Sequence, residues 1–161
     1  MNHFFRSASG LDARGVGPRI MLATAPFLAA AIVLEILSAP FTDIFSVYNQ
    51  FIGLFGWVWL VIGIAAFIIS MAQFISNFPK GKLITSGMYA CSRNPIYASW
   101  AVFILPAVGA IGNNWVFIAA ALIMCMATSL LVKEEENQLL EVFGESYTKY
   151  RKKVGSIIRF L

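Results

Sequence analysis

Charge is scarce in this sequence. Only 12% of its 161 residues are charged, whereas 59% are hydrophobic and the mean hydropathy is +0.76. Water-soluble domains carry about 25% charged residues, so the composition excludes an ordinary soluble domain and predicts an integral membrane protein. The net charge of +4 could suit nucleic acid, but the basic residues flank apolar segments. There they suit membrane topology and lipid headgroups, and we expect no nucleic-acid partner.

Histidine and cysteine are also scarce. The single histidine, His3, lies in a polar N-terminal segment, Cys91 in a polar loop and Cys125 in an apolar run. Two cysteines so placed do not make a disulfide framework. With one histidine and no cysteine cluster, we predict no protein-bound transition metal.

Four apolar segments account for most of the chain, at about residues 20–39, 51–74, 95–111 and 115–132. Each is predicted to be a helix, because lipid cannot satisfy exposed backbone groups. The first segment is expected to be retained rather than cleaved as a secretory signal, because Pro40 follows the only small-residue cleavage point and Glu35 interrupts it. Glu35 is also a functional candidate, as an ionisable residue within a span. The expected fold is one all-α domain, residues 1–161, of four transmembrane helices.

Lysine and arginine are absent from two of the three loops. All twelve lie in the N-terminal segment, the loop at 75–94 or the C-terminal tail. Four spans place these three basic segments on one side of the membrane, and the positive-inside rule makes that side cytoplasmic. We therefore expect a multi-pass protein of a bacterial inner membrane with both termini in the cytoplasm.

The tail combines apolar residues at helical spacing over 139–154, interrupted by Gly144, with a cationic cluster at Lys149 and 151–153. This pattern predicts an amphipathic helix on the cytoplasmic surface, in contact with anionic lipid. Such a helix can also cap a site built from the central loop.

The stretch "GMYACSRNPIYASW" (87–100) concentrates polar groups before the third apolar segment. Pro95 suits the first turn of a helix, and Asn94 suits its N-cap, where the side chain accepts a backbone N–H. Arg93 lies beside that helix N-terminus, which favours an anion. With Tyr89 and Tyr97 as aromatic walls, these residues predict a receptor for a carboxylate or phosphate. The alternative for Arg93 is an interfacial charge that snorkels to water.

An acidic run, Glu134, Glu135 and Glu136, follows the fourth apolar segment. Successive helical residues rotate by about 100°, so at least one of these carboxylates is predicted to face neighbouring helices. Anionic side chains near a helix C-terminus and an anionic lipid surface are unfavourable. This placement favours a role in accepting hydrogen bonds from a ligand with hydroxyl or amine groups. The alternative is a solvated helix face.

Two ordered motifs within residues 80–155 carry a resemblance to a known family. "LITSGMYACSRNPIYASW" resembles the signature L-x-T-S-G-x-Y-x-x-x-R-H-P-x-Y of isoprenylcysteine carboxyl methyltransferases and related phospholipid methyltransferases. "EENQLLEVFGESYTKYRKKV" resembles that superfamily's E-E-x-x-L-x-x-x-F-G-x-x-Y-x-x-Y-x-x-x-V. Asn94 replaces the usual histidine, Glu134 is an extra acid, and the tail lacks the common closing proline.

The resemblance implies an integral-membrane enzyme that uses S-adenosylmethionine as its cofactor. It implies methyl transfer to a lipophilic acceptor at the cytoplasmic face, either an isoprenylcysteine-like carboxylate or a phospholipid amine. An amine acceptor must lose a proton, which Glu135 or Glu136 can accept. By position it assigns catalysis to Arg93, Glu135 and Glu136. By the same resemblance, the residues expected to bind the cofactor are Tyr89, Arg93, Asn94, Pro95, Tyr97, Glu135 and Glu136.

The chemistry of these side chains agrees with the resemblance. Arg93 suits the carboxylate of the cofactor, a glutamate suits its ribose diol or ammonium, and tyrosine faces suit its sulfonium. Two other classes stay open: a membrane reductase of sterol-like substrates with a nicotinamide cofactor, and a non-enzymatic membrane scaffold.

The charge pattern makes a topology prediction. Reporter fusions after residues 45 and 113 are expected to report the non-cytoplasmic side, and fusions after residues 80 and 161 the cytoplasm, because the basic segments stay inside. Activity of paired cytoplasmic and periplasmic reporters measures this. A cytoplasmic signal at residue 113 would contradict the four-span arrangement.

Overall fold

The computed structural model describes residues 17–37 and 49–157, and within these ranges the chain is helical with no strand. The all-α prediction is confirmed for this part of the chain. His3 lies outside the described residues, as does the side chain of Glu35. The α-helices and the one π-helical segment of the described residues are α1 (Gly17–Ile36), α2 (Asn49–Asn77), α3 (Pro95–Ala98), η5 (Ser99–Ile104, π-helical), α4 (Leu105–Ile111), α5 (Val116–Phe143) and α6 (Glu145–Lys153). Two 3₁₀ turns, η3 (Phe78–Lys80) and η4 (Gly87–Ala90), lie between α2 and α3.

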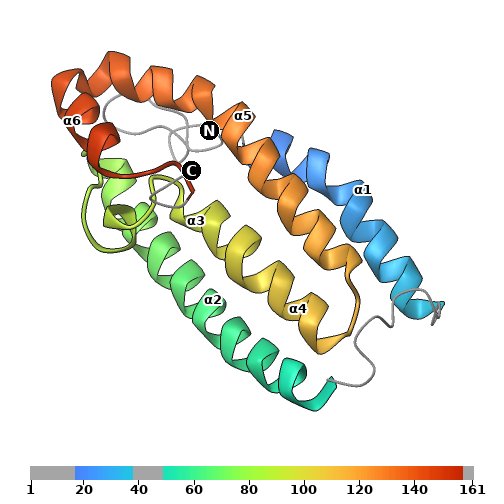
Figure 1. The fold of residues 1–161 in the computed structure, drawn as a ribbon. Coiled ribbons are helices and arrows are strands. Elements are labelled where there is room, and N and C mark those ends of the chain that lie inside the picture. The colour runs from blue at the N-terminus through green and yellow to red at the C-terminus, as the bar shows by residue number, and fades with distance from the viewer. Residues whose placement is uncertain (1–16, 38–48, 158–161) are drawn as a thin grey trace.

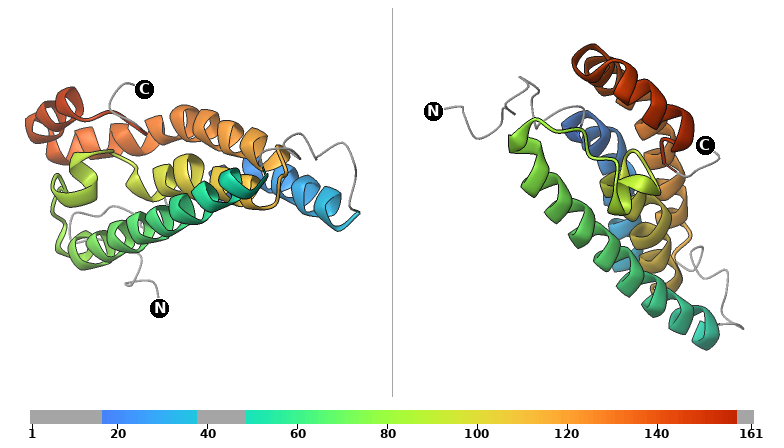
Figure 2. Two further views of the ribbon diagram at one scale, coloured as in Figure 1. Left: turned by 60° about the horizontal axis from the view of Figure 1, so that its bottom comes forward. Right: turned by 90° about the vertical axis from the view of Figure 1, so that its left-hand side faces the viewer.

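The long helices form a row in which α5 packs between α1 and α4, and α2 packs on the other side of α4 (Figure 1). Two contacts fix α1 antiparallel to α5. Arg19 Nη1 lies 2.6 Å from Glu134 Oε2 at one end, and Asn114 Nδ2 donates to the Ala31 carbonyl at 3.1 Å at the other. The start of α1 therefore lies at the same end of the bundle as α6, and α2 also ends there (Figure 2).

Two helices are long and apolar enough to cross a membrane, at Phe51–Lys80 and Val116–Phe143. The helices at Pro18–Val33 and Pro95–Ile111 are apolar but shorter. Large hydrophobic side chains such as Phe55 and Leu130 are more than 60% exposed, as lipid-facing residues would be. The four predicted apolar helices therefore exist, while their insertion as four spans stays a prediction.

Glycines let α2 approach its neighbour closely. A Cβ on Gly63 would lie 2.7 Å from Phe103 Cβ and 2.9 Å from Ile104 Cγ1. A Cβ on Gly56, two turns earlier, would lie 2.9 Å from Ile111 Cγ1. Small residues at such spacing allow backbones to pack tightly in lipid, where no hydrophobic force drives helices together. The Gly56–Gly63 face thus fixes how α2 sits on the third apolar helix.

Pro106 explains the irregular centre of that helix. It has no N–H to donate to the Val102 carbonyl four residues earlier. The indole Nε1 of Trp59 on α2 donates to that carbonyl at 3.0 Å instead. The chain widens into η5 immediately before this point, with Leu105 N–H bonded to the Trp100 carbonyl. Residues 95–111 therefore continue as one helix despite the proline.

The glycine contacts make a stability prediction. Gly63→Ala is expected to destabilise the folded protein by about 1–3 kcal/mol, because the added methyl group overpacks the interface. Gly53→Ala is the matched control, since nothing lies within 4 Å of the added Cβ; it should be neutral or stabilising. Thermal unfolding in detergent measures both. Equal behaviour of the two variants would show that the close approach does not constrain α2.

Candidate functional site

The acidic run turns one carboxylate inward, as the helical rotation predicts. All three residues lie on α5, which continues past the apolar segment to Phe143. Glu134 is exposed, Glu135 is half-buried and Glu136 is only 6% exposed. A solvated face therefore describes Glu134 but is wrong for Glu136.

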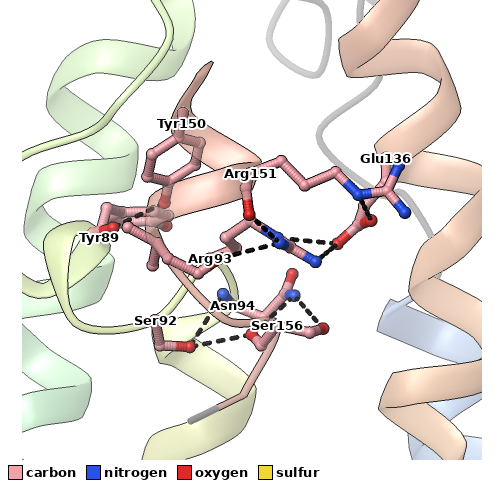
Figure 3. Close-up of polar contacts among 9 residues, drawn as sticks. Tyr89, Ser92, Arg93, Asn94, Glu136, Tyr150, Arg151 and Ser156 are labelled. Atoms are coloured by element: carbon pink, nitrogen blue, oxygen red, sulfur yellow. Dashed lines mark hydrogen bonds and ion pairs between the residues drawn. The ribbon is translucent and has the colours of Figure 1, made fainter. Parts of the chain in front are cut away.

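Arg93 is the partner of the buried carboxylate (Figure 3). Its Nε and Nη2 donate to Glu136 Oε1 at 3.0 and 2.6 Å, and both side chains are nearly buried. Arg151 Nε lies 3.5 Å from the other oxygen, Oε2, but its side chain is 51% exposed. The snorkelling alternative for Arg93 is therefore wrong. Removing one member of such a buried pair typically costs about 3–5 kcal/mol, because the other charge stays buried.

The remaining contacts of Arg93 tie the tail to the same point. Nη1 donates to the carbonyls of Arg151 at 3.1 Å and Val154 at 2.8 Å. Four of its five N–H groups thus donate to protein acceptors. One side chain holds the central loop, the end of α5 and the end of α6 together.

Residues 154–156, here called the tail strap, run beside residues 92–94. The backbone N–H groups of Arg93 and Asn94 donate to the carbonyls of Gly155 at 2.9 Å and Ser156 at 3.1 Å. Ser92 Oγ donates to the Ser156 carbonyl at 3.0 Å. This pairing satisfies backbone groups on both segments and fixes the loop in place.

Asn94 does not cap the helix as predicted. It occupies the N-cap position of α3, but its side chain makes no capping hydrogen bond. Instead Nδ2 donates to the carbonyl and the hydroxyl of Ser156, each at 3.1 Å. The capping prediction was wrong because the tail strap offers two acceptors that the local sequence does not show.

The other predicted residues lie around this cluster. Burial raises the pKa of Tyr89, and the nearby Glu135 carboxylate raises it further. Tyr97 is half-buried on α3 and packs against the core cluster that includes Leu105 and Val132. Pro95 is buried at the first turn of α3, as its position in the sequence predicts. The fold therefore gathers all seven predicted residues at one end of the bundle.

Two tyrosines of α6 complete the cluster and were not among the predicted site residues. Tyr150 donates its hydroxyl to the Tyr89 carbonyl at 2.6 Å. Tyr147 is 1% exposed, and its hydroxyl has no hydrogen-bond partner among the described residues. Burial, and then the Glu136 charge, raise the pKa of Tyr147 to about 12, so the hydroxyl is protonated at neutral pH. A buried hydroxyl without a partner costs about 1–3 kcal/mol. Both are the tyrosines of the Y-x-x-Y pattern in the second motif, which was the sequence signal for them.

Gln73 near the end of α2 is another contributor that sequence reasoning missed. Its Oε1 accepts the backbone N–H of Met88 at 3.1 Å. The adjacent Gly87 has φ +63°, and a Cβ there would lie 1.8 Å from Gln73 Nε2. Glycine at residue 87 therefore suits both the positive φ and the close approach of the Gln73 side chain.

Comparison with known proteins agrees with the two motifs. The family model for phospholipid methyltransferase matches residues 44–146, more than half of the chain. Protein-S-isoprenylcysteine O-methyltransferase of Schizosaccharomyces pombe is 35% identical over 74 residues, covering 46% of this chain and 31% of that protein. The Xenopus laevis and Homo sapiens proteins of the same name are each 32% identical over 79 residues, 49% of this chain.

The matched region is a small part of those relatives. It spans 27% of the Xenopus laevis protein and 28% of the human protein. No solved structure matches the chain.

Substitutions of Asn94 can distinguish its contact with the tail strap from a helix-capping role. Asn94→Asp is expected to destabilise the protein at least as much as Asn94→Ala, by about 1–2 kcal/mol, because a carboxylate cannot donate to the Ser156 carbonyl. An N-cap would instead tolerate Asp. Ser156→Ala is the control and should cost less, since the carbonyl of residue 156 remains. Thermal unfolding in detergent ranks the three variants, and an Asn94→Asp protein as stable as wild type would contradict the assignment.

Proposed function

Because this chain belongs to the phospholipid methyltransferase family, we propose that it transfers a methyl group from S-adenosylmethionine to a lipophilic acceptor at the cytoplasmic membrane face. The observation that carries the proposal is the buried contact between Arg93 of the first motif and Glu136 of the second. It brings the two motifs into one charged cluster at one end of an apolar bundle. Such a position suits a polar donor and a lipid-borne acceptor.

The side chains present fit the methyl donor. Its amino-acid part carries a carboxylate and an ammonium, and its ribose carries two hydroxyls. Arg93 and Arg151 suit the carboxylate. Glu135 suits the ammonium or the ribose hydroxyls, and the tyrosine faces suit a sulfonium. The buried hydroxyl of Tyr147 is a further polar group at this point that lacks a partner among the described residues.

Arg93 also has a structural role. Four of its N–H groups donate to Glu136 and to carbonyls of the tail, so Arg93 holds the two motifs next to each other. Asn94 and Pro95 set the backbone between Arg93 and Tyr97. We assign the donor site to these residues together with Tyr89, Glu135 and Glu136.

Catalysis at such a site consists mainly of positioning. When bound, the donor supplies an electrophilic methyl carbon on a sulfonium. The protein contributes orientation and exclusion of water. A carboxylate acceptor needs no base. An amine acceptor must first lose a proton, which Glu135 or Glu136 can accept.

The membrane arrangement follows the same proposal. The start of α1 and the end of α5 share one end of the bundle through Arg19 and Glu134. Exposed cations on α6 lie at this end too: Lys149, Arg151, Lys152 and Lys153. We assign this end to the cytoplasm, with four spans and both termini inside, and the exposed face of α6 to an anionic lipid surface.

Ligand-induced stabilisation tests the function. S-adenosylmethionine or its demethylated product should raise the melting temperature of the wild type, since a ligand that binds only the folded state stabilises it. Glu135→Gln keeps the side-chain size but removes the charge, so it should weaken binding by about tenfold or more. Glu134→Gln, an exposed carboxylate one residue earlier, is the matched control and should bind like the wild type.

Two results would contradict the proposal. No shift in the well-folded wild type at millimolar ligand would favour the reductase or scaffold alternatives. Equal shifts in the wild type and both variants would remove Glu135 from the donor site.

A further inference from the structure

Two tyrosines one turn apart on α6 share an environment but differ in their hydroxyls. The rings of Tyr147 and Tyr150 lie 6.2 Å apart, edge to face. Both belong to one buried cluster with Val154, against which Leu83, Leu139 and Phe143 pack. The apolar part of each ring is therefore explained by packing alone. A phenylalanine would supply the same packing at either position.

The hydroxyl of Tyr150 forms a hydrogen bond that links two parts of the fold. The hydroxyl of Tyr147 forms no such bond with the described residues. Tyr150 donates to the Tyr89 carbonyl at 2.6 Å and so attaches α6 to the central loop. Tyr147 buries its oxygen without a hydrogen-bond partner among the described residues. Buried polar groups in folded proteins are nearly always paired, so the partner of this oxygen is to be sought beyond the described residues.

The position of Tyr147 indicates the kind of partner. The charged groups that act on its hydroxyl are the carboxylates of Glu136 and Glu135 and the guanidinium groups of Arg93 and Arg151. The phenol is protonated and hence a donor, so its partner is an acceptor, and the two guanidinium groups allow that acceptor to be an anion. Arg151 is the most exposed member of this cluster, and its Nε lies a long 3.5 Å from Glu136. It is therefore the member of the cluster that is held least tightly.

We propose that the Tyr147 hydroxyl donates a hydrogen bond to the carboxylate of the amino-acid part of the bound methyl donor. The inference rests on the function proposed above and adds one ligand-contacting residue to it. Tyr147 supplies a neutral donor, so it recognises the carboxylate without adding another buried charge. Arg93 then need not abandon its contacts with Glu136 and the tail.

The test compares Tyr147→Phe, Tyr150→Phe and the wild type, each as the full chain in detergent. Binding of S-adenosylmethionine and of its decarboxylated analogue is measured by calorimetry, and unfolding is measured without ligand. Tyr147→Phe should bind S-adenosylmethionine about ten- to hundredfold more weakly, as expected for one lost hydrogen bond to a charged group. Its affinity for the decarboxylated analogue should be unchanged. Without ligand it should melt at or above the wild-type temperature, whereas Tyr150→Phe should melt below it.

Each opposite result overturns the inference. Wild-type affinity of Tyr147→Phe for S-adenosylmethionine would remove the contact. An equal loss for both ligands would place the hydroxyl on another part of the donor. A lower melting temperature of ligand-free Tyr147→Phe would mean that the hydroxyl is already satisfied inside the fold. Failure of the wild type to bind either ligand would instead refute the proposed function, and this inference with it.

Discussion

A buried ion pair between Arg93 and Glu136 determines how this end of the bundle is built. Two charges removed from water are tolerated only with close geometry and further hydrogen bonds, and Arg93 provides both through its planar fork. Its other N–H groups donate to the carbonyls of Arg151 and Val154, so the same side chain also satisfies carbonyls at the end of α6. The central loop, the end of α5 and the tail strap therefore occupy one arrangement.

Away from this cluster, buried hydroxyl groups of the described apolar helices form hydrogen bonds within their own helix. Thr24, Ser70, Ser99 and Thr128 are buried, and each hydroxyl donates to the carbonyl four residues earlier. Such bonds satisfy the hydroxyl inside its own helix, as a membrane environment requires. The Trp59 indole donates to the Val102 carbonyl, to which Pro106 has no N–H to donate. Apart from the Trp59 bond, long-range polar contacts among the described residues are concentrated near the two ends of the bundle, at Asn114 and at the candidate site.

Much of the helical fold, and the gathering of the candidate residues at one end of it, could be predicted from the sequence. The length of the apolar runs predicted the helices, and Gly144 predicted the break between α5 and α6. The rotation between successive helical residues predicted that one carboxylate of the acidic run faces inward, as Glu136 does. The pairing of that carboxylate could not be predicted, because periodicity gives a direction but no partner. Asn94 shows the same limit. Its neighbours in sequence suggested a helix cap, while its acceptors lie on Ser156, 62 residues away.

The tail strap also has a consequence for the order in which the protein is assembled. Arg93 and Val154 are separated by 61 residues of chain, and Ser92 and Ser156 by 64. During synthesis the central loop therefore emerges well before its strap, and α2 and the helix at 95–111 can pair first through the Gly63 contact. Arg93 acquires its tail acceptors only after α5 and α6 have left the ribosome. A polypeptide that ended before residue 154 would lack the carbonyls of Val154, Gly155 and Ser156, which accept hydrogen bonds from Arg93 and Asn94.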